Sequence, residues 1–141
     1  MAGVILDTCG LLEIRLREGS EKVEAAVDAL DDGALFVSVI SFCQIRKGAC
    51  LLPAGRRRSE LEDSLSRLET GLHAQTPAID LETARVWGEL TAAARRKELQ
   101  AAPADSLIAA TALRHDLAVM TRNVRDLEPT GVRIFDPRND P

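Results

Sequence analysis

Val4-Ile5-Leu6-Asp7-Thr8, near the start of this 141-residue chain, is a short apolar run that ends in a carboxylate. A continuous apolar run of this kind is typical of a strand at the centre of a parallel sheet, because both faces of such a strand are covered. Asp7 marks the end of the run. The stretch therefore predicts an α/β fold with a carboxylate at the end of a central strand.

Strand-like and helix-like patterns alternate along the rest of the chain, which is the pattern of an α/β domain. Further strands are predicted over residues 35–39, 78–80, 117–121 and 132–135, of which 78–80 is the weakest. Helices are predicted from near Gly10, after Ser20, after Ser41, over 55–73, around 84–94 and from Pro103. Residues 122–131 are expected to form a loop or a single helical turn.

Apolar faces on these helices predict how they pack against the sheet. One stripe contains Leu61, Leu65, Leu68 and Leu72, and another contains Ala84, Trp87, Leu90 and Ala94. Residues 107–113 are apolar nearly all round, so we expect the helix that begins at Pro103 to be buried.

The composition is that of an ordinary globular protein, with 45% apolar and 28% charged residues. A net charge of -4 and a pI near 5.2 argue against charge-driven coating of nucleic acid but leave room for a local basic patch. No apolar stretch reaches the ~20 residues that a membrane crossing needs, and the N-terminus does not resemble a signal peptide. We expect a cytoplasmic protein with one domain over residues 1–136 and a tail over 137–141.

Polar side chains lie just beyond the predicted strands. Asp7 follows the first strand, and Gln44 lies in the helical turn after the second. Asn123 and Asp126 follow the strand at 117–121, and Asp105 lies in the N-terminal turn of the buried helix. Right-handed crossovers bring such positions to one edge of an open sheet, where ligands bind. Converging carboxylates favour Mg²⁺, which can activate water and neutralise a phosphodiester. The alternative is that these residues are ordinary helix caps and turn residues.

Four short words of sequence surround these positions in order. They are Val4-Ile5-Leu6-Asp7-Thr8, Ser38-Val39-Ile40-Ser41 running into Gln44-Ile45-Arg46-Lys47-Gly48, Pro103-Ala104-Asp105-Ser106-Leu107-Ile108-Ala109-Ala110-Thr111, and Thr121-Arg122-Asn123-Val124-Arg125-Asp126-Leu127. Together they closely resemble the PIN-domain toxins of the VapC type, over nearly the whole chain. The resemblance implies a three-layer α/β/α PIN-like fold with a central, mostly parallel sheet of four to five strands.

The resemblance also implies an activity and partners. It implies a Mg²⁺- or Mn²⁺-dependent endoribonuclease that forms a homodimer and is neutralised by a cognate VapB-type antitoxin. Carried over by position, it implies that Asp7, Asp105 and Asp126 bind the metal ion. Gln44 and Asn123 fall at further positions of the same catalytic site.

Two positions depart from the family pattern, which has Glu at the place of Gln44 and Asn at the place of Cys9. Ser41-x-x-Gln44 fits a capping box, for which Gln serves as well as Glu, so the fold does not need the charge. A metal ion does need it, since the lost charge is worth on the order of a few kcal/mol at close range. The chain is therefore expected to be a weakened nuclease or, alternatively, a catalytically silent PIN domain that binds an antitoxin or RNA.

Four basic residues lie next to the predicted acidic edge: Arg46, Lys47, Arg122 and Arg125. They are candidates for contacts with RNA phosphates, since phosphate contacts position a nucleic acid. The alternative is that they form ion pairs with the aspartates of the site.

The three cysteines, Cys9, Cys43 and Cys50, lack the C-x-x-C spacing of a zinc knuckle and are expected to be small buried thiols. Cys9 with Cys43 is a less favoured Zn²⁺ or redox pair. A dehalogenase-like or receiver-type phosphoryl site on Asp7 fits less well, because the dehalogenase class needs a second Asp where this chain has Cys9.

Overall fold

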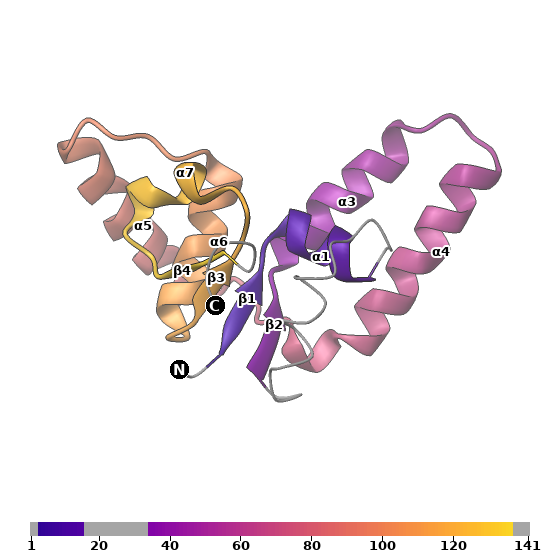
Figure 1. The fold of residues 1–141 in the computed structure, drawn as a ribbon, viewed down its shortest axis with the longest axis horizontal. Helices are drawn as coiled ribbons and strands as arrows, with labels where there is room; N and C mark the ends of the chain where they lie inside the picture. The colour runs from indigo at the N-terminus through magenta and orange to yellow at the C-terminus, as the bar shows by residue number, and fades with distance from the viewer. Residues whose placement is uncertain (1–2, 16–33, 137–141) are drawn as a thin grey trace.

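The computed structural model describes residues 3–15 and 34–136, which form a parallel sheet with helices on both faces (Figure 1). Its strands are β1 (Val4–Leu6), β2 (Leu35–Val37), β3 (Ala118–Met120) and β4 (Ile134–Phe135), in the order β2-β1-β3-β4. Leu6 of β1 is in register with Val37 and with Met120. β1 is thus a central strand, as its apolar sequence predicts, and the α/β/α fold class is confirmed.

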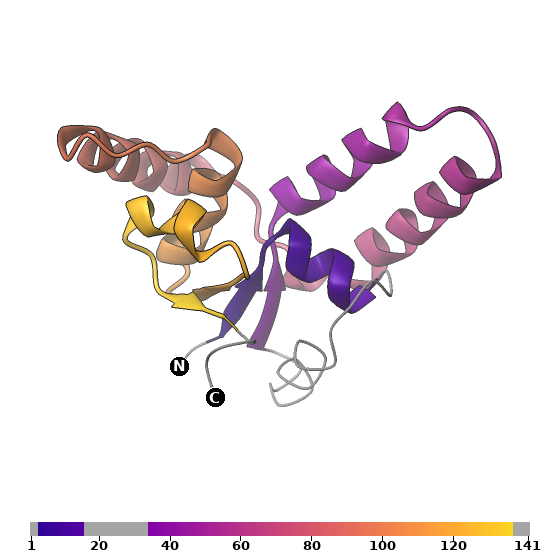
Figure 2. The same ribbon diagram turned by 45° about the horizontal axis from the view of Figure 1, so that its top comes forward.

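The helices form two groups that diverge from the sheet as two arms (Figures 1 and 2). One group contains α1 (Thr8–Arg15), α3 (Val39–Leu51) and α4 (Arg56–Gly71), and the other contains α5 (Leu81–Arg96), α6 (Pro103–Arg114) and α7 (Val124–Leu127). Short 3-10 helices are η2 (His73–Gln75) and η3 (Glu128–Thr130). α1 and α7 follow the carboxyl ends of β1 and β3, and in Figure 1 α1 lies beside α3 while α7 lies over α6.

Alternate residues of the strands face two separate hydrophobic clusters, as the pleat of a sheet requires. The cluster beneath α1, α3 and α4 contains Val4, Leu6, Leu11, Leu35, Val37, Ile45, Leu65, Leu72, Ala118 and Met120. The cluster beneath α5, α6 and α7 contains Ile5, Leu90, Ile108, Ala109, Ala112, Leu117, Val119, Leu127 and Val132. The three layers are therefore held by burial on both faces of one short sheet.

The predicted apolar faces are largely confirmed. Leu65 and Leu72 of the α4 stripe are buried and Leu61 and Leu68 pack against them, while α6 buries Ile108 to Ala112. The predicted face of α5 is wrong at one position, because Ala84 is exposed and Thr83 is buried.

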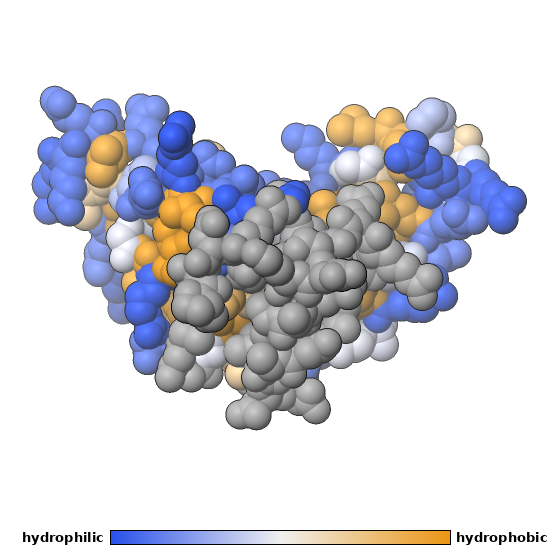
Figure 3. Space-filling model, in the orientation of Figure 1, coloured by the Kyte–Doolittle hydropathy of each residue, from blue (hydrophilic) through white to orange (hydrophobic). Residues whose placement is uncertain are grey.

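Figure 3 shows hydrophilic colour over most of both arms, with hydrophobic colour near the free end of the α3–α4 arm, where Leu51 is 76% exposed.

The predicted strand at 78–80 is wrong. Asp80 is instead the N-cap of α5, and its Oδ1 accepts hydrogen bonds from the backbone N–H of Thr83 at 2.9 Å and from its hydroxyl at 2.8 Å. A side chain that caps a helix fixes its own residue at the helix boundary. The helix start thus takes precedence over the weak strand pattern.

The predicted N-cap of the helix after β2, Ser41, is also wrong. α3 begins at Val39, and Ser38 caps it by accepting a 3.0 Å hydrogen bond from the backbone N–H of Ile40. Ser41 therefore lies inside the first turn of α3 and is fully buried.

Two predictions lie outside the described residues: the helix after Ser20 and the tail over 137–141. Within the described ranges, none of the helices combines the length and the apolar character that a membrane crossing requires.

Candidate metal centre

Asp7 lies between β1 and α1 and is only 7% exposed. Its Oδ1 accepts a 2.7 Å hydrogen bond from the backbone N–H of Gly10, so Asp7 caps α1. A Cβ at Gly10 would lie 3.1 Å from the same oxygen, so the glycine allows the helix to approach the carboxylate closely. The start of its own helix therefore fixes the Asp7 carboxylate.

Thr121 fixes the same carboxylate from the neighbouring strand. Its hydroxyl donates a 2.5 Å hydrogen bond to Oδ2 of Asp7 and accepts a 2.9 Å bond from the backbone N–H of Asn123. The register of β1 with β3 places positions 7 and 121 side by side, just beyond Leu6 and Met120. No sequence prediction assigns a role to Thr121, although a hydroxyl beside Asp7 at the end of an adjacent parallel strand is the signal that could reveal it.

Gln44 lies on the exposed side of α3 and contacts the first turn of α1, where its Oε1 accepts a hydrogen bond from the Thr8 hydroxyl. The predicted capping box of Ser41 with Gln44 is wrong, because the cap of α3 is Ser38. Thr8 directly follows Asp7, so the Gln44 side chain lies next to the candidate site rather than at the start of its own helix.

Asp105, in the first turn of α6, lies near Asp126 of α7. Partial burial raises the pKa of the Asp105 carboxyl, and the negative charge of Asp126 raises this pKa further. Like charges raise a carboxyl pKa only at short range. The fold therefore brings these two predicted acids together.

Asn123 connects the two parts of the site through its backbone. Its N–H donates to Thr121, and its C=O accepts a 3.1 Å hydrogen bond from the backbone N–H of Asp126. A continuous series of hydrogen bonds therefore runs from Asp7 through Thr121 and Asn123 to Asp126.

The predicted ligands fit a hard divalent cation by their chemistry. Carboxylate oxygens, with amide oxygens beside them, are what Mg²⁺ and Mn²⁺ prefer. A cation beside Asp105 would offset the negative charge of Asp126, which raises the pKa of the Asp105 carboxyl. Within residues 3–15 and 34–136, however, no three His, Cys, Asp or Glu side chains are close enough together to hold an ion as one group.

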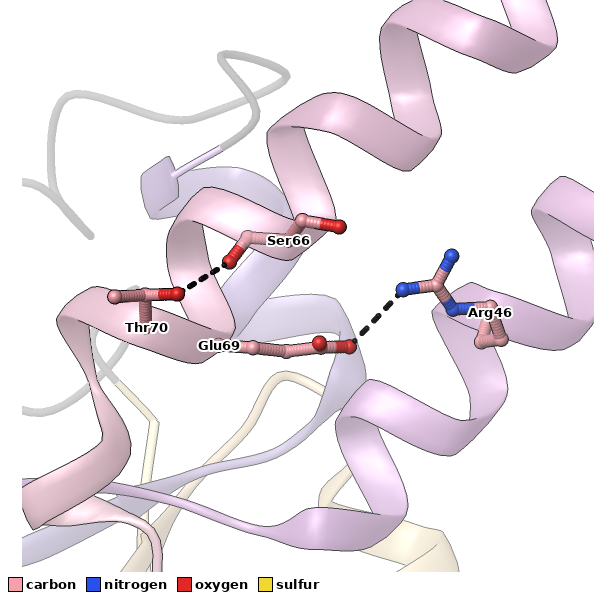
Figure 4. A network of polar contacts seen from close by, with 4 residues as sticks. All are labelled: Arg46, Ser66, Glu69 and Thr70. Carbon is pink, nitrogen blue, oxygen red and sulfur yellow. Dashed lines mark hydrogen bonds and ion pairs between the residues drawn. The ribbon is translucent and has the colours of Figure 1, made fainter.

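The four predicted basic residues do not share one environment. Arg46 forms a 3.2 Å ion pair with Glu69 of α4 and thus bridges the two helices of one arm (Figure 4). Lys47, Arg122 and Arg125 are exposed. Arg122 directly precedes Asn123, the N-cap of α7, and Arg125 lies in the first turn of that helix.

Two of the cysteines differ from the prediction. Cys43 and Cys50 of α3 are exposed, so the expectation of buried thiols is wrong for both. The side chain of Cys9 lies outside the described part of the chain.

Comparison with known proteins identifies the family. Residues 4–128 match the PIN domain family. The chain is 31% identical over 135 residues to the VapC ribonuclease Y4jK of Sinorhizobium fredii, a match that covers 95% of this chain and 96% of that protein. It is 29% identical over 138 residues to Toxin FitB of Neisseria gonorrhoeae, with 97% of this chain and 99% of that protein covered.

Solved structures give the same result. The crystal structure of FitAcB from Neisseria gonorrhoeae matches with a TM-score of 0.86 and 28% identity, over 96% of this chain and 99% of that one. Fold and sequence agree, and the chain therefore belongs to the PIN domain family, among its VapC-type toxins.

Proposed function

We propose that this chain is a Mg²⁺- or Mn²⁺-dependent endoribonuclease, the toxin of a type II toxin–antitoxin pair, and that Gln44 weakens its activity. The observation that carries the proposal is the buried Asp7 carboxylate, held from both sides by Gly10 and Thr121 at the end of the central strand. Relatives named as a VapC ribonuclease and as a toxin support the activity.

In this proposal Asp7, Asp105 and Asp126 hold the cation, which would have to draw Asp7 and the other two carboxylates closer together than they lie without it. When bound, such an ion supplies an activated water and neutralises charge on the scissile phosphodiester. The hydrogen bonds to Asp7 orient its carboxylate before the ion arrives, which reduces the entropy lost on binding. Asn123, exposed next to the acids, is proposed to hydrogen-bond water at the site.

Basic side chains are proposed to contact the phosphates on either side of the scissile bond. Lys47, Arg122 and Arg125 are exposed, and the last two belong to the segment that contains Asp126. Arg46 can join them only by leaving Glu69, and an exposed ion pair of this kind contributes only ~0–1 kcal/mol. An RNA phosphate can therefore compete for Arg46 at little cost.

Gln44 favours a second candidate function, a catalytically silent PIN domain that binds an antitoxin or RNA. Its amide contacts Thr8, the residue after Asp7. The negative charge that a Glu would carry at position 44 is therefore absent next to the candidate site. The two candidates differ in how many carboxylates the cation requires. If three are enough, the chain is a nuclease; if the fourth is required, the chain binds no cation and is silent.

Cleavage of a mixed tRNA and rRNA substrate with Mg²⁺ or Mn²⁺, by this chain and by Gln44→Glu, separates the two candidates. We expect slow cleavage by this chain and a rate at least about tenfold higher for Gln44→Glu, since one restored charge contributes more than ~1.4 kcal/mol. Asp126→Asn in the Gln44→Glu background is the matched control and should abolish cleavage. Activity confined to Gln44→Glu would support the silent domain, and no activity in either would overturn the nuclease.

We further propose that the chain acts in the cytoplasm as a homodimer and is neutralised by a VapB-type antitoxin. A solved structure that is 26% identical to this chain is described as DNA-bound VapBC from Salmonella typhimurium. Co-expression with the product of a small adjacent reading frame should yield a stable complex, and light scattering should give twice the monomer mass for the free chain. A monomer that captures no such product would contradict both parts.

A further inference from the structure

A hydrogen-bonded relay joins α5 to the first turn of α6. The indole N–H of Trp87 donates to the Ser106 hydroxyl at 2.8 Å, and that hydroxyl donates to the C=O of Pro103 at 3.0 Å. Ser106 is fully buried, and its one hydroxyl serves as acceptor and donor at once. The relay therefore has a single direction, from the indole to the backbone of α6.

The first turn of α6 depends on this relay because it has no side-chain cap. Ala102, at the N-cap position, makes no capping bond, and Pro103 has no N–H. The relay ties residues 103 and 106 to α5, and Asp105 lies between them in sequence.

We infer that Trp87 is a positioning residue that holds the first turn of α6, and through it the Asp105 carboxylate, in place for a divalent cation. The inference rests on the proposed function, in which Asp105 is a ligand. Asp105 is partly buried and close to Asp126, so a small rotation of its turn would change the distance between the two carboxylates. Trp87 is also the only tryptophan in the chain, so paramagnetic Mn²⁺ bound at Asp105 should quench its fluorescence.

Two variants break the relay at different atoms. Trp87→Phe keeps an aromatic ring and removes the N–H, and Ser106→Ala removes the hydroxyl. The matched control is Thr111→Val, since Thr111 is also buried on α6 and its hydroxyl donates to the C=O of Leu107 at 2.9 Å, away from Asp105.

The test compares Mn²⁺ binding, measured by calorimetry, with the Mn²⁺ dependence of RNA cleavage. Each relay variant should raise the dissociation constant and the half-saturating Mn²⁺ concentration about 3- to 10-fold, as expected for one hydrogen bond. The double variant should bind Mn²⁺ as tightly as the single variant with the lower affinity, because both changes break the same relay. Cleavage at saturating Mn²⁺ should stay within about twofold, since binding rather than chemistry is affected. Thr111→Val should bind Mn²⁺ like the unchanged chain.

Unchanged Mn²⁺ affinity in both relay variants, or an equal loss in Thr111→Val, would overturn the positioning role while leaving the proposed function intact. If the unchanged chain binds no Mn²⁺ and cleaves no RNA, the proposed function fails instead. Amide hydrogen exchange of residues 103–108 without metal then decides the positioning role. Both relay variants should accelerate this exchange relative to Thr111→Val, and no acceleration would overturn the inference.

Discussion

The bond from Thr121 to Asp7 joins two neighbouring strands through side chains, just past the last backbone pair of β1 and β3. Its acceptor is a buried carboxylate, and a buried charge is costly unless hydrogen bonds satisfy it. This single hydroxyl therefore affects both the stability of the fold and the orientation of a proposed metal ligand.

We predict that Thr121→Val lowers the free energy of unfolding by ~1.5–3 kcal/mol, the range for a hydrogen bond to a charged group. The shape of the side chain is kept, but Asp7 and the N–H of Asn123 each lose a partner. Urea unfolding at neutral pH measures the change.

Thr130→Val is the matched control for this prediction. Thr130 is also buried, and its hydroxyl donates to the C=O of Leu127, which is uncharged. We expect the control to lose only ~0.5–1.5 kcal/mol. If Thr121→Val costs no more than Thr130→Val, the charged bond is not the cause.

The contact of Gln44 shows what sequence can and cannot establish about a single residue. The resemblance to the VapC-type toxins predicts Gln44 at the site, and in the structure Gln44 accepts a hydrogen bond from Thr8, the residue after Asp7. Its partner could not be predicted, because a hydrogen bond between α3 and α1 depends on how the two helices pack and not on spacing within either one.

At the scale of the element, the start of α3 separates two serines that look alike in sequence. Ser38 and Ser41 are three residues apart, and serine is a favoured N-cap at either position. β2 ends at Val37, and this leaves Ser38 in the extended conformation that an N-cap requires. The strand end, a tertiary feature, decides which serine is the cap.

We predict opposite effects for the two serines. Ser38→Ala should lower the free energy of unfolding by about 1 kcal/mol, the usual value of a lost cap. Ser41→Ala should be neutral or stabilising, because the buried Ser41 hydroxyl has no hydrogen-bond partner within the described part of the chain. Denaturant unfolding of both variants tests this, and the reverse order would restore Ser41 as the cap.

Elements with strong local patterns were predictable and the weak ones were not. The α4 leucine stripe and the apolar run of β1 are confirmed because each pattern satisfies one period over its length. The short run at 78–80 satisfies a strand pattern only weakly, and Asp80 caps α5. In so short a segment one side-chain bond outweighs the strand preference.

At the scale of the whole molecule, the acids lie toward one edge of the sheet because helices from both of its faces begin or pass near the carboxyl ends of its strands. Asp7 lies at the start of α1, on one side, while Asp105 and Asp126 belong to α6 and α7, on the other. Sequence could predict this edge from the crossover rule. The separation of Asp7 from the Asp105–Asp126 pair could not be predicted, since it depends on the angle between the two helical layers.

The position of Asp105 near Asp126 makes the stability of the fold depend on pH and on a bound divalent cation. The raised pKa of Asp105 means that the folded state binds its proton more tightly than the unfolded state. The resulting stabilisation is fully present below the unfolded pKa of ~3.9 and is lost as pH rises through the raised folded pKa. At neutral pH the ionised Asp105 therefore destabilises the fold.

We predict that Asp105→Asn is more stable than the unchanged chain at pH 7.5 without metal, and that this advantage shrinks as pH falls toward 4. Mn²⁺ should reverse the order, since an ion at 100 times its dissociation constant adds ~2.7 kcal/mol to a folded protein that binds it. Asp63→Asn, a change at an exposed aspartate of α4, is the control and should follow the unchanged chain throughout. Urea midpoints across this pH range, with and without Mn²⁺, measure all three proteins. A variant that Mn²⁺ stabilises as much as the unchanged chain would remove Asp105 from the proposed ligands, because a cation can stabilise only through the groups that bind it.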